Sequence, residues 1–307
     1  MSDKKPYSYF IGGIVICLLG AVCFSTKAIF VKLAYRDTDV DPVSLLALRM
    51  LFSLPFFIAS AIFSFNQSAN VRFTRKQWIS VALVGCCGYY LSSLLDFLGL
   101  QYISAGLERL ILFIYPTLVL LMSFLIFNVK IKTLQWFALL VTYFGLFIAF
   151  WGEIGFQSEN ENLYKGALLI FVCAFTYALY IVGSGRLIPI LGAAKFNSYA
   201  MSFAALAVLI HFFITSDSSL FGQSYTVYLY SFLMAILSTV IPSYLIAEGI
   251  KRIGSDNAAI VGSIGPVSTI LQASIFLQEP IHSLQLAGTA LILLGVLMIG
   301  HKKQIIE

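Results

Sequence analysis

The sequence predicts an all-α integral membrane protein with ten transmembrane helices, arranged as two inverted five-helix repeats. Its 307 residues are 60% hydrophobic and 11% charged, with a mean hydropathy of +0.92, whereas soluble domains contain about 25% charged residues. The apolar residues gather in ten stretches, each close to the ~20 residues that a helix needs to cross a bilayer. The two halves of the chain also align on each other.

The stretches are continuously apolar rather than alternating, which favours helices over a β-barrel, since every backbone polar group must be satisfied inside lipid. The connections between them are short. The expected spans cover residues 10–33, 43–65, 78–100, 106–127, 134–151, 166–182, 196–213, 225–247, 258–277 and 284–300.

The basic residues predict how these spans are oriented. Cytoplasmic segments carry an excess of Lys and Arg in membrane proteins, so the side that holds most of them is taken as the inside. Both termini, residues 1–9 and 301–307, are therefore predicted to be cytoplasmic. The net charge of +5 follows from this orientation and does not indicate nucleic-acid binding. The basic residues on the predicted inner side are Lys4, Lys5, Arg72, Arg75, Lys76, Lys130, Lys132, Arg186, Lys195, Lys251, Arg252, Lys302 and Lys303.

A displacement of 150 residues aligns the second half on the first without a gap, and the first spans align after a three-residue adjustment. The matched pairs include Gly13 with Gly166, Gly99 with Gly249, Pro116 with Pro266, Gln135 with Gln285 and Gly145 with Gly295. The repeats then cover residues 10–151 and 166–300, joined by an outer connector at 152–165. Five spans are an odd number, so the second repeat enters the membrane from the opposite side. Inverted repeats are typical of secondary transporters, which bind substrate between the halves near the middle of the bilayer.

Two stretches carry a likeness to a known family. They are "ISAGLERLILFIYPTLVLL" at residues 103–121 and "IGPVSTILQASIFLQEPIHSLQLAGTALILLGVLMI" at residues 264–299. In the second, "QEP" followed by a last helix with Gln and Gly resembles the end of an EamA domain. The chain therefore resembles the EamA-type, ten-span members of the drug/metabolite transporter superfamily. The resemblance implies an alternating-access carrier, commonly an exporter of amino acids, metabolites or toxic compounds, and often proton-coupled.

Ionisable residues inside the spans of the first half are the main candidates for the transport pathway. They are Lys27, Arg49, Asp96, Glu108 and Arg109, all within roughly 10 Å of the outer boundary at ~1.5 Å per residue. A charge at the centre of a lipid-facing helix costs about 2.5–3.5 kcal/mol. We therefore expect a paired network that lines an outward water-filled cavity. Snorkelling to the interface is the alternative for a single Lys or Arg.

Polar residues add to this expected site. Tyr89, Ser92, Ser93 and Asp96 recur at three- and four-residue intervals in the third span, so they form a stripe on one helix face. That stripe is expected to line the cavity.

Two prolines fall at equivalent places in the middle of spans. Pro116 and Pro266 each remove a backbone hydrogen bond and favour a kink. Near them, Tyr115, Ser263 and Gln272 are candidates to hydrogen-bond a substrate, although each of these residue types is also common in ordinary packing.

The predicted function is thus a secondary transporter, expected to export a small metabolite, amino acid or drug-like solute. Asp96 and Glu108 are the candidate proton carriers, because burial favours the neutral form of a carboxyl group while a neighbouring cation favours its ionised form. Solute uptake or exchange is the alternative direction. The five charges add to +1 when all are ionised, which favours an anionic substrate, but a bound anion or water could also balance it.

Other classes are weighed against this one. An integral-membrane lipid-modifying enzyme would use the same polar layer, but no HExxH, Cys/His cluster, GxSxG or Walker loop occurs, so we predict no enzyme activity, metal or cofactor. A scaffold without transport is a third possibility. The expected partners are a small-molecule substrate and the lipid bilayer. The sequon at residues 66–68 lies on the predicted cytoplasmic side, which favours a bacterial inner membrane.

Overall fold

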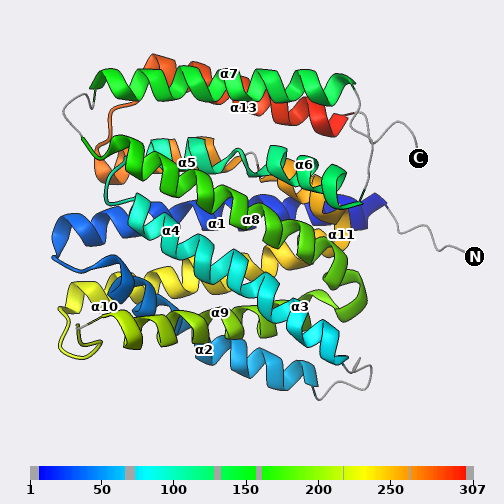
Figure 1. The fold of residues 1–307 in the computed structure, drawn as a ribbon, viewed down its shortest axis with the longest axis vertical. Helices are drawn as coiled ribbons and strands as arrows, with labels where there is room; N and C mark the ends of the chain where they lie inside the picture. The colour runs from blue at the N-terminus through cyan, green and yellow to red at the C-terminus, as the bar shows by residue number, and fades with distance from the viewer. Residues whose placement is uncertain are drawn as a thin grey trace, which may run out of the picture.

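The computed structural model describes residues 7–65, 73–127, 133–156, 161–216, 218–262 and 264–301. Over these ranges the chain is a bundle of helices that lie roughly along one direction, with no strand among them (Figure 1). The predicted all-α class is confirmed.

Most of the helical stretches can cross a membrane. Within the described ranges, eight are long and apolar enough: Ser8–Asp37, Pro42–Phe63, Arg75–Gly99, Ala105–Ile126, Leu163–Leu191, Ala193–Thr215, Tyr225–Ser255 and Asn257–Leu277. Two shorter apolar helical stretches, Leu140–Ala149 and Ser283–Gly295, lie where the fifth and tenth spans are expected. The chain is therefore an integral membrane protein, and ten crossings stay a prediction.

The first half begins with two long helices and continues with a series of interrupted ones. A π-helical turn, η1, joins α3 and α4 into one rod. The bounds are α1 (Tyr7–Asp37), α2 (Pro42–Phe65), α3 (Arg75–Gly85), η1 (Cys86–Leu91), α4 (Ser92–Gly99), α5 (Ala105–Leu112), α6 (Tyr115–Phe127) and α7 (Thr133–Phe156).

The second half begins with the same order of elements and differs after η2. Its π-helical turn η2 again interrupts the third rod, and a further turn, η3, ends the fourth. The bounds are α8 (Leu163–Leu191), α9 (Ala193–Thr215), α10 (Tyr225–Ala235), η2 (Ile236–Val240), α11 (Ile241–Val261), α12 (Ile264–Gln272), η3 (Ala273–Leu277) and α13 (Ser283–His301).

Polar residues cap the starts of several helices. Thr74 and Gln77 form a reciprocal capping box at α3, while Ser104 accepts a hydrogen bond from the Leu107 backbone at the start of α5. Ser224 accepts one from Val227 at α10. A side-chain oxygen at this position satisfies a backbone N–H group that has no partner within the helix. These residues therefore set where the apolar rods begin.

Both halves are interrupted at equivalent positions. The π-helical turns η1 and η2 begin 150 residues apart, at Cys86 and Ile236. α5 gives way to α6 just before Pro116, where Ile114 donates to the Ile111 carbonyl at 3.1 Å, a shorter-range bond than the α-helical one. α11 likewise ends just before Pro266, at Val261. Because proline has no N–H to donate, a helix that restarts with proline in its first turn loses nothing there.

Equivalent residues of the two halves also make reciprocal contacts. A Cβ added to Gly13 in α1 would lie 2.6 Å from Cγ2 of Ile253, and one added to Gly166 in α8 would lie 2.7 Å from Cγ2 of Ile103. The repeat alignment exchanges these two contacts, because it matches Gly13 with Gly166 and Ile103 with Ile253. Both helices therefore approach their neighbours where only glycine fits.

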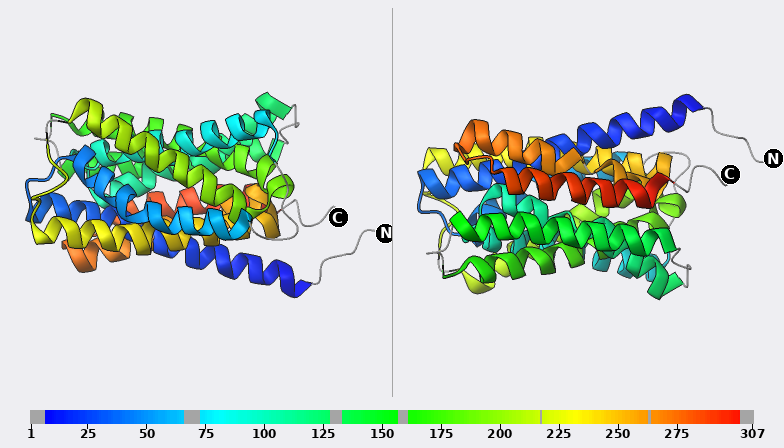
Figure 2. Two further views of the ribbon diagram at one scale, coloured as in Figure 1. Left: turned by 90° about the horizontal axis from the view of Figure 1, so that it is seen from below. Right: turned by 90° about the horizontal axis from the view of Figure 1, so that it is seen from above.

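The packing interlocks the halves. α1 of the first half packs on α11 and α12 of the second, whereas α8 of the second half packs on α4 and α6 of the first. α2 lies on α9. α7 and α13 form a pair along one side of the bundle, and the start of α1 and the end of α13 lie at the same end (Figures 1 and 2). The centre of the bundle is thus enclosed by helices from both halves.

Candidate functional site

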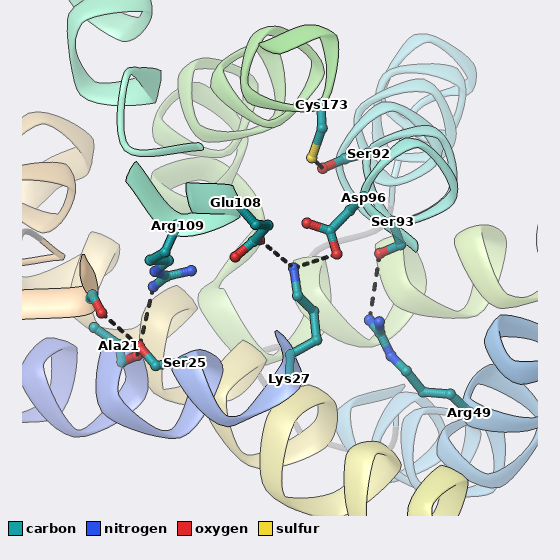
Figure 3. Close-up of polar contacts among 11 residues, drawn as sticks. Ala21, Ser25, Lys27, Arg49, Ser92, Ser93, Asp96, Glu108, Arg109 and Cys173 are labelled. Atoms are coloured by element: carbon teal, nitrogen blue, oxygen red, sulfur yellow. Dashed lines mark hydrogen bonds and ion pairs between the residues drawn. The ribbon is translucent and has the colours of Figure 1, made fainter. Parts of the chain in front are cut away.

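A buried ion-pair network lies where α1, α4 and α5 meet (Figure 3). Lys27 Nζ is 2.8 Å from Asp96 Oδ2 and 3.5 Å from Glu108 Oε1. The Lys27 residue is 4% exposed and both acidic residues are fully buried. One ammonium group is therefore shared by two carboxylates, at a depth where an unpaired charge is costly.

Arg49 connects the two halves. It extends from α2, is fully buried, and donates from Nε to Thr239 Oγ1 of η2 at 2.8 Å. Its Nη2 lies 3.5 Å from Ser93 Oγ of α4, and its guanidinium carbon is 5.3 Å from the centre of the Phe97 ring. Among the described residues, no carboxylate forms an ion pair with Arg49. Hydroxyl groups and an aromatic face hold this charge.

Arg109 follows Glu108 in the chain but points to a different neighbour, since successive residues on a helix are about 100° apart. Its Nη2 donates to Ser25 Oγ of α1 at 3.4 Å, and Ser25 Oγ lies 3.3 Å from the Gly265 carbonyl oxygen of α12. A Cβ on Gly265 would lie 2.8 Å from Arg109 Nε. Arg109 therefore occupies a space that depends on glycine at position 265. Figure 3 shows its contact with Ser25.

A small cavity lies between these groups. Its volume is about 30 Å³, which holds about two water molecules and is far below the ~300 Å³ at which ligand pockets begin. A substrate can bind here only after the helices move apart. Its walls include Lys27 and Arg109, the hydroxyl groups of Ser92, Ser93 and Tyr115, the thiol of Cys173, and the rings of Phe24 and Tyr177.

Aromatic rings continue from the cavity toward the second half. The ring centres of Tyr115 and Tyr177 are 5.1 Å apart and nearly perpendicular, and those of Tyr177 and Tyr180 are 5.9 Å apart. Tyr89 packs edge-on against Tyr180 at 5.0 Å. The hydroxyl group of Tyr115 donates to the Ala259 carbonyl oxygen of α11 at 3.3 Å. This cluster forms an apolar floor beside the charges.

The sequence-based candidates fall in different places. Lys27, Ser92, Ser93, Arg109 and Tyr115 line the cavity. Asp96 and Glu108 are buried behind Lys27, and Arg49 and Tyr89 are buried outside the cavity wall.

Three further candidates lie on or beside the ninth expected span. The Gln272 amide donates to Ser268 one turn earlier on α12, away from the cavity. Pro266 is buried in α12, while Ser263 lies outside the described residues.

Sequence reasoning missed two hydroxyl partners of the arginines, Ser25 and Thr239. Thr239 could have been found through the repeat, because it aligns with Tyr89, a member of the predicted polar stripe. Ser25 gave no such signal, since a single serine in an apolar helix is common.

The α4–α5 connection beside the network is held from two directions. The Glu279 carboxylate, which follows η3, accepts hydrogen bonds from the backbone N–H groups of Ala105 at 3.1 Å and Gly106 at 3.2 Å. Lys32 Nζ donates to the carbonyl oxygens of Leu100 at 3.1 Å and Ile103 at 3.0 Å. A negative charge at the N-terminus of a helix and a positive charge at a C-terminus are both stabilising. These contacts tie α1 and the residues after η3 to the connection between α4 and α5.

Comparisons with known proteins agree with this architecture. The pattern of the EamA-like transporter family matches residues 11–151 and again residues 164–300. The chain is 32% identical to the uncharacterized transporter YcbK of Bacillus subtilis over 283 residues, which cover 90% of this chain and 88% of that protein. It is 26% identical to the uncharacterized transporter YyaM of the same organism, over 92% of each chain.

A solved structure titled "Crystal structure of protein" has the same fold. Its TM-score is 0.69 at 18% identity, and the match covers 96% of this chain and 99% of that one. The helical bundle, its membrane-length helices and its relatives together define a membrane transporter with a small-molecule substrate. The chain belongs to the EamA-like transporter family, as the resemblance to the drug/metabolite transporter superfamily predicts.

Proposed function

We propose that this protein is a secondary active transporter that exports a small metabolite, amino acid or drug-like solute by alternating access, driven by protons. The observation that carries the proposal is the small polar cavity, whose walls come from both halves of the chain and border a buried ion-pair network. Alternating access requires a site that can open to either side, and helices contributed by two halves can separate at either end.

The internal repeat supports this mechanism. We propose ten crossings in two inverted repeats, residues 10–151 and 166–300, with an outer connector at 152–165. The paired π-helical turns and the reciprocal glycine contacts of α1 and α8 are what a two-fold relation between the halves would produce. In such an arrangement, the outward-open and inward-open states arise by exchanging the conformations of the two repeats.

Asp96 and Glu108 are the proposed proton carriers. Both carboxylates depend on the single ammonium group of Lys27 for charge balance. When the cavity opens, one carboxylate can separate from Lys27 and hydrogen-bond to water instead. That carboxylate can then take up or release a proton. Closing the cavity without a proton would bury an excess negative charge, which is costly. Protonation is thereby linked to opening and closing.

The first test measures access to Cys173, a native residue on the cavity wall. The other four cysteines are replaced, and the variant is treated with an anionic, membrane-impermeant methanethiosulfonate on intact cells and on inverted vesicles. We expect labelling from both faces. A matched variant that keeps only Cys17, which is as buried as Cys173 but packs on Gly249 and does not line the cavity, should label from neither. Labelling of Cys173 from one face only, under all conditions, would contradict alternating access.

The second test measures coupling and direction in proteoliposomes loaded with a pH-sensitive dye. Amino acids, nucleosides and aromatic carboxylates are added one at a time, with and without a pH gradient. We expect a transported solute to move protons in the wild type and not in Asp96→Asn or Glu108→Gln. Glu161→Gln, in the exposed connector, is the matched control. Solute flux that is independent of the pH gradient in the wild type and in all three variants would exclude proton coupling. Vesicles of known orientation distinguish export from uptake or exchange.

The proposed location is a bacterial inner membrane with both termini in the cytoplasm. The start of α1 and the end of α13 lie at one end of the bundle (Figure 2), as an even number of crossings requires. Fusing a cytoplasm-dependent reporter to each terminus tests this. The competing class, a lipid-modifying membrane enzyme, predicts that a radiolabelled solute is chemically changed after crossing, whereas a transporter returns it unchanged.

A further inference from the structure

The charge of Arg109 has no acidic partner among the described residues. The residue is 8% exposed, and its Nε has no hydrogen-bond partner. Its contact with Ser25 spans 3.4 Å, near the upper limit for a hydrogen bond. Burying a cation without a counter-ion is unfavourable. Some group that enters the cavity can therefore gain free energy by pairing with Arg109.

Among the described residues, the cavity wall has positive groups and no negative one. Lys27 and Arg109 line it, and the two carboxylates of the network do not. Lys27 is already balanced by Asp96 and Glu108. The charge that the wall presents to a solute therefore comes from the guanidinium group of Arg109, which can hold a carboxylate through two parallel hydrogen bonds.

The remaining wall suits a flat apolar body. Phe24, Tyr115 and Tyr177 come from three different helices and enclose the same cavity as Arg109. Phe24 and Tyr177 have ring centres 6.3 Å apart, a separation at which aromatic rings already interact. As the helices separate, a further ring can enter between them and keep these contacts.

We infer that the cavity binds an aromatic carboxylate without an ammonium group, with Arg109 holding the carboxylate and the rings of Tyr115 and Tyr177 holding the aromatic body. An amino acid fits less well, because its ammonium group would meet no acidic side chain among the described wall residues and would lie near Arg109 and Lys27. Removing that group removes a repulsion and keeps every favourable contact. The inference rests on the proposed transport function for its physiological meaning, but binding is measurable without transport.

The test uses four small molecules that differ mainly in charge: 3-phenylpropionate, phenylalanine, 3-phenylpropanamide and phenethylamine. Each is titrated against the purified full chain in detergent, and the rise in melting temperature gives the affinity, because a ligand that binds only the native state stabilises it. We expect 3-phenylpropionate to stabilise most. Phenylalanine and the amide should bind about tenfold more weakly or worse, and the amine should have no effect.

Variants then assign the anion to Arg109. Arg109→Gln should weaken 3-phenylpropionate binding about tenfold or more, since charge-assisted hydrogen bonds are among the stronger ones, while binding of the neutral amide changes little. Arg109→Lys keeps the charge without the planar fork and should lie between. Arg75→Gln removes the same charge from the exposed first residue of α3 and should match the wild type. The ratio between anion and amide reports selectivity even where a variant lowers overall stability.

The outcomes separate this inference from the transport proposal. Tighter binding of phenylalanine or phenethylamine than of 3-phenylpropionate overturns it, as does an unchanged anion preference in Arg109→Gln, and so does an absence of binding by all four. Radiolabelled flux of the same four compounds into proteoliposomes is then compared. If 3-phenylpropionate binds but is not transported, the binding site is supported and the transport proposal is contradicted for this solute. If only the amide or the amine is transported, the transport proposal is supported and the assigned substrate class is contradicted.

Discussion

The two halves of the chain share one plan but carry different chemistry. The expected spans of the second half contain no Asp, Glu, Lys or Arg, whereas those of the first half contain the ion-pair network and both buried arginines. Under the repeat alignment, the charged residues Lys27, Asp96, Glu108 and Arg109 correspond to Tyr180, Ile246, Ala258 and Ala259. The packing is therefore similar in the two halves, whereas ionisable residues within the expected spans occur only in the first half.

The two halves therefore contribute different groups around the cavity. The first half supplies the charges, and the second half supplies Tyr177 on the wall and the Thr239 hydroxyl that holds Arg49. Each half thus provides what the other lacks. Substituting equivalent packing residues in the two halves should lower the free energy of unfolding by similar amounts. Substitutions of the buried charged residues can be made only in the first half, because the expected spans of the second half contain none.

The largest effect is expected for Lys27→Met. It leaves the carboxylates of Asp96 and Glu108 buried without a cation, and breaking a buried pair in this way costs about 3–5 kcal/mol. Denaturant unfolding in detergent measures the loss. Adding Asp96→Asn and Glu108→Gln to the same chain should restore most of the stability. Lys251→Met, at an exposed pair with Glu248, is the control, and a similar loss there would show that the network has no special role.

Arg49→Lys tests the link between the halves. The shorter-reaching ammonium group loses the bond from Nε to Thr239, and hydrogen bonds of charged groups contribute about 1.5–3 kcal/mol. Thr239→Val removes the same bond from the other side. In a double-mutant cycle, the two changes should cost clearly less together than the sum of their separate costs. Additive losses would mean that Arg49 and Thr239 act independently.

Paired glycine substitutions test whether the packing is equivalent. A Cβ on Gly99 would lie 2.5 Å from Cδ1 of Ile170, and one on Gly249 would clash with the Cys17 thiol. Gly99→Ala and Gly249→Ala should therefore each cost about 1–3 kcal/mol, the usual range for overpacking. Cys17→Ala should rescue Gly249→Ala and leave Gly99→Ala unchanged. If only one of the two glycine substitutions lowered the stability strongly, the packing of the two halves would not be equivalent.

The smallest effect is expected for Glu279→Gln. The neutral amide keeps the shape of the side chain but weakens its interaction with the N-terminus of α5 by about 0.5–1 kcal/mol. Backbone amides of Ala105 and Gly106 should then exchange hydrogen about three- to fivefold faster. The equivalent position in the first half is Val129, so no carboxylate can act there. Unchanged exchange would show that the start of α5 does not depend on Glu279.

Much of the fold could be predicted from the sequence because hydropathy acts over whole segments. Each expected span falls mainly on helical segments of the described residues, although some include a break between helices, and the charged candidates are buried, as a network rather than a lipid-facing position requires. The side-chain contacts between helices could not be predicted, because they depend on how each helix is rotated about its axis. Gln272, for example, hydrogen-bonds along its own helix instead of facing the cavity.

The sequence by itself determined that this chain is an all-helical membrane protein with a duplicated plan, and that the charges within its expected spans lie in the first half. Those features follow from segment composition and spacing, which survive any arrangement of the helices. Only the tertiary structure decided that one lysine contacts two carboxylates while Arg109 faces a cavity without an acidic partner among the described residues. Neighbours on a helix point about 100° apart, so Glu108 and Arg109, adjacent in the chain, reach different surroundings, and ångström-scale distances set the chemistry of each.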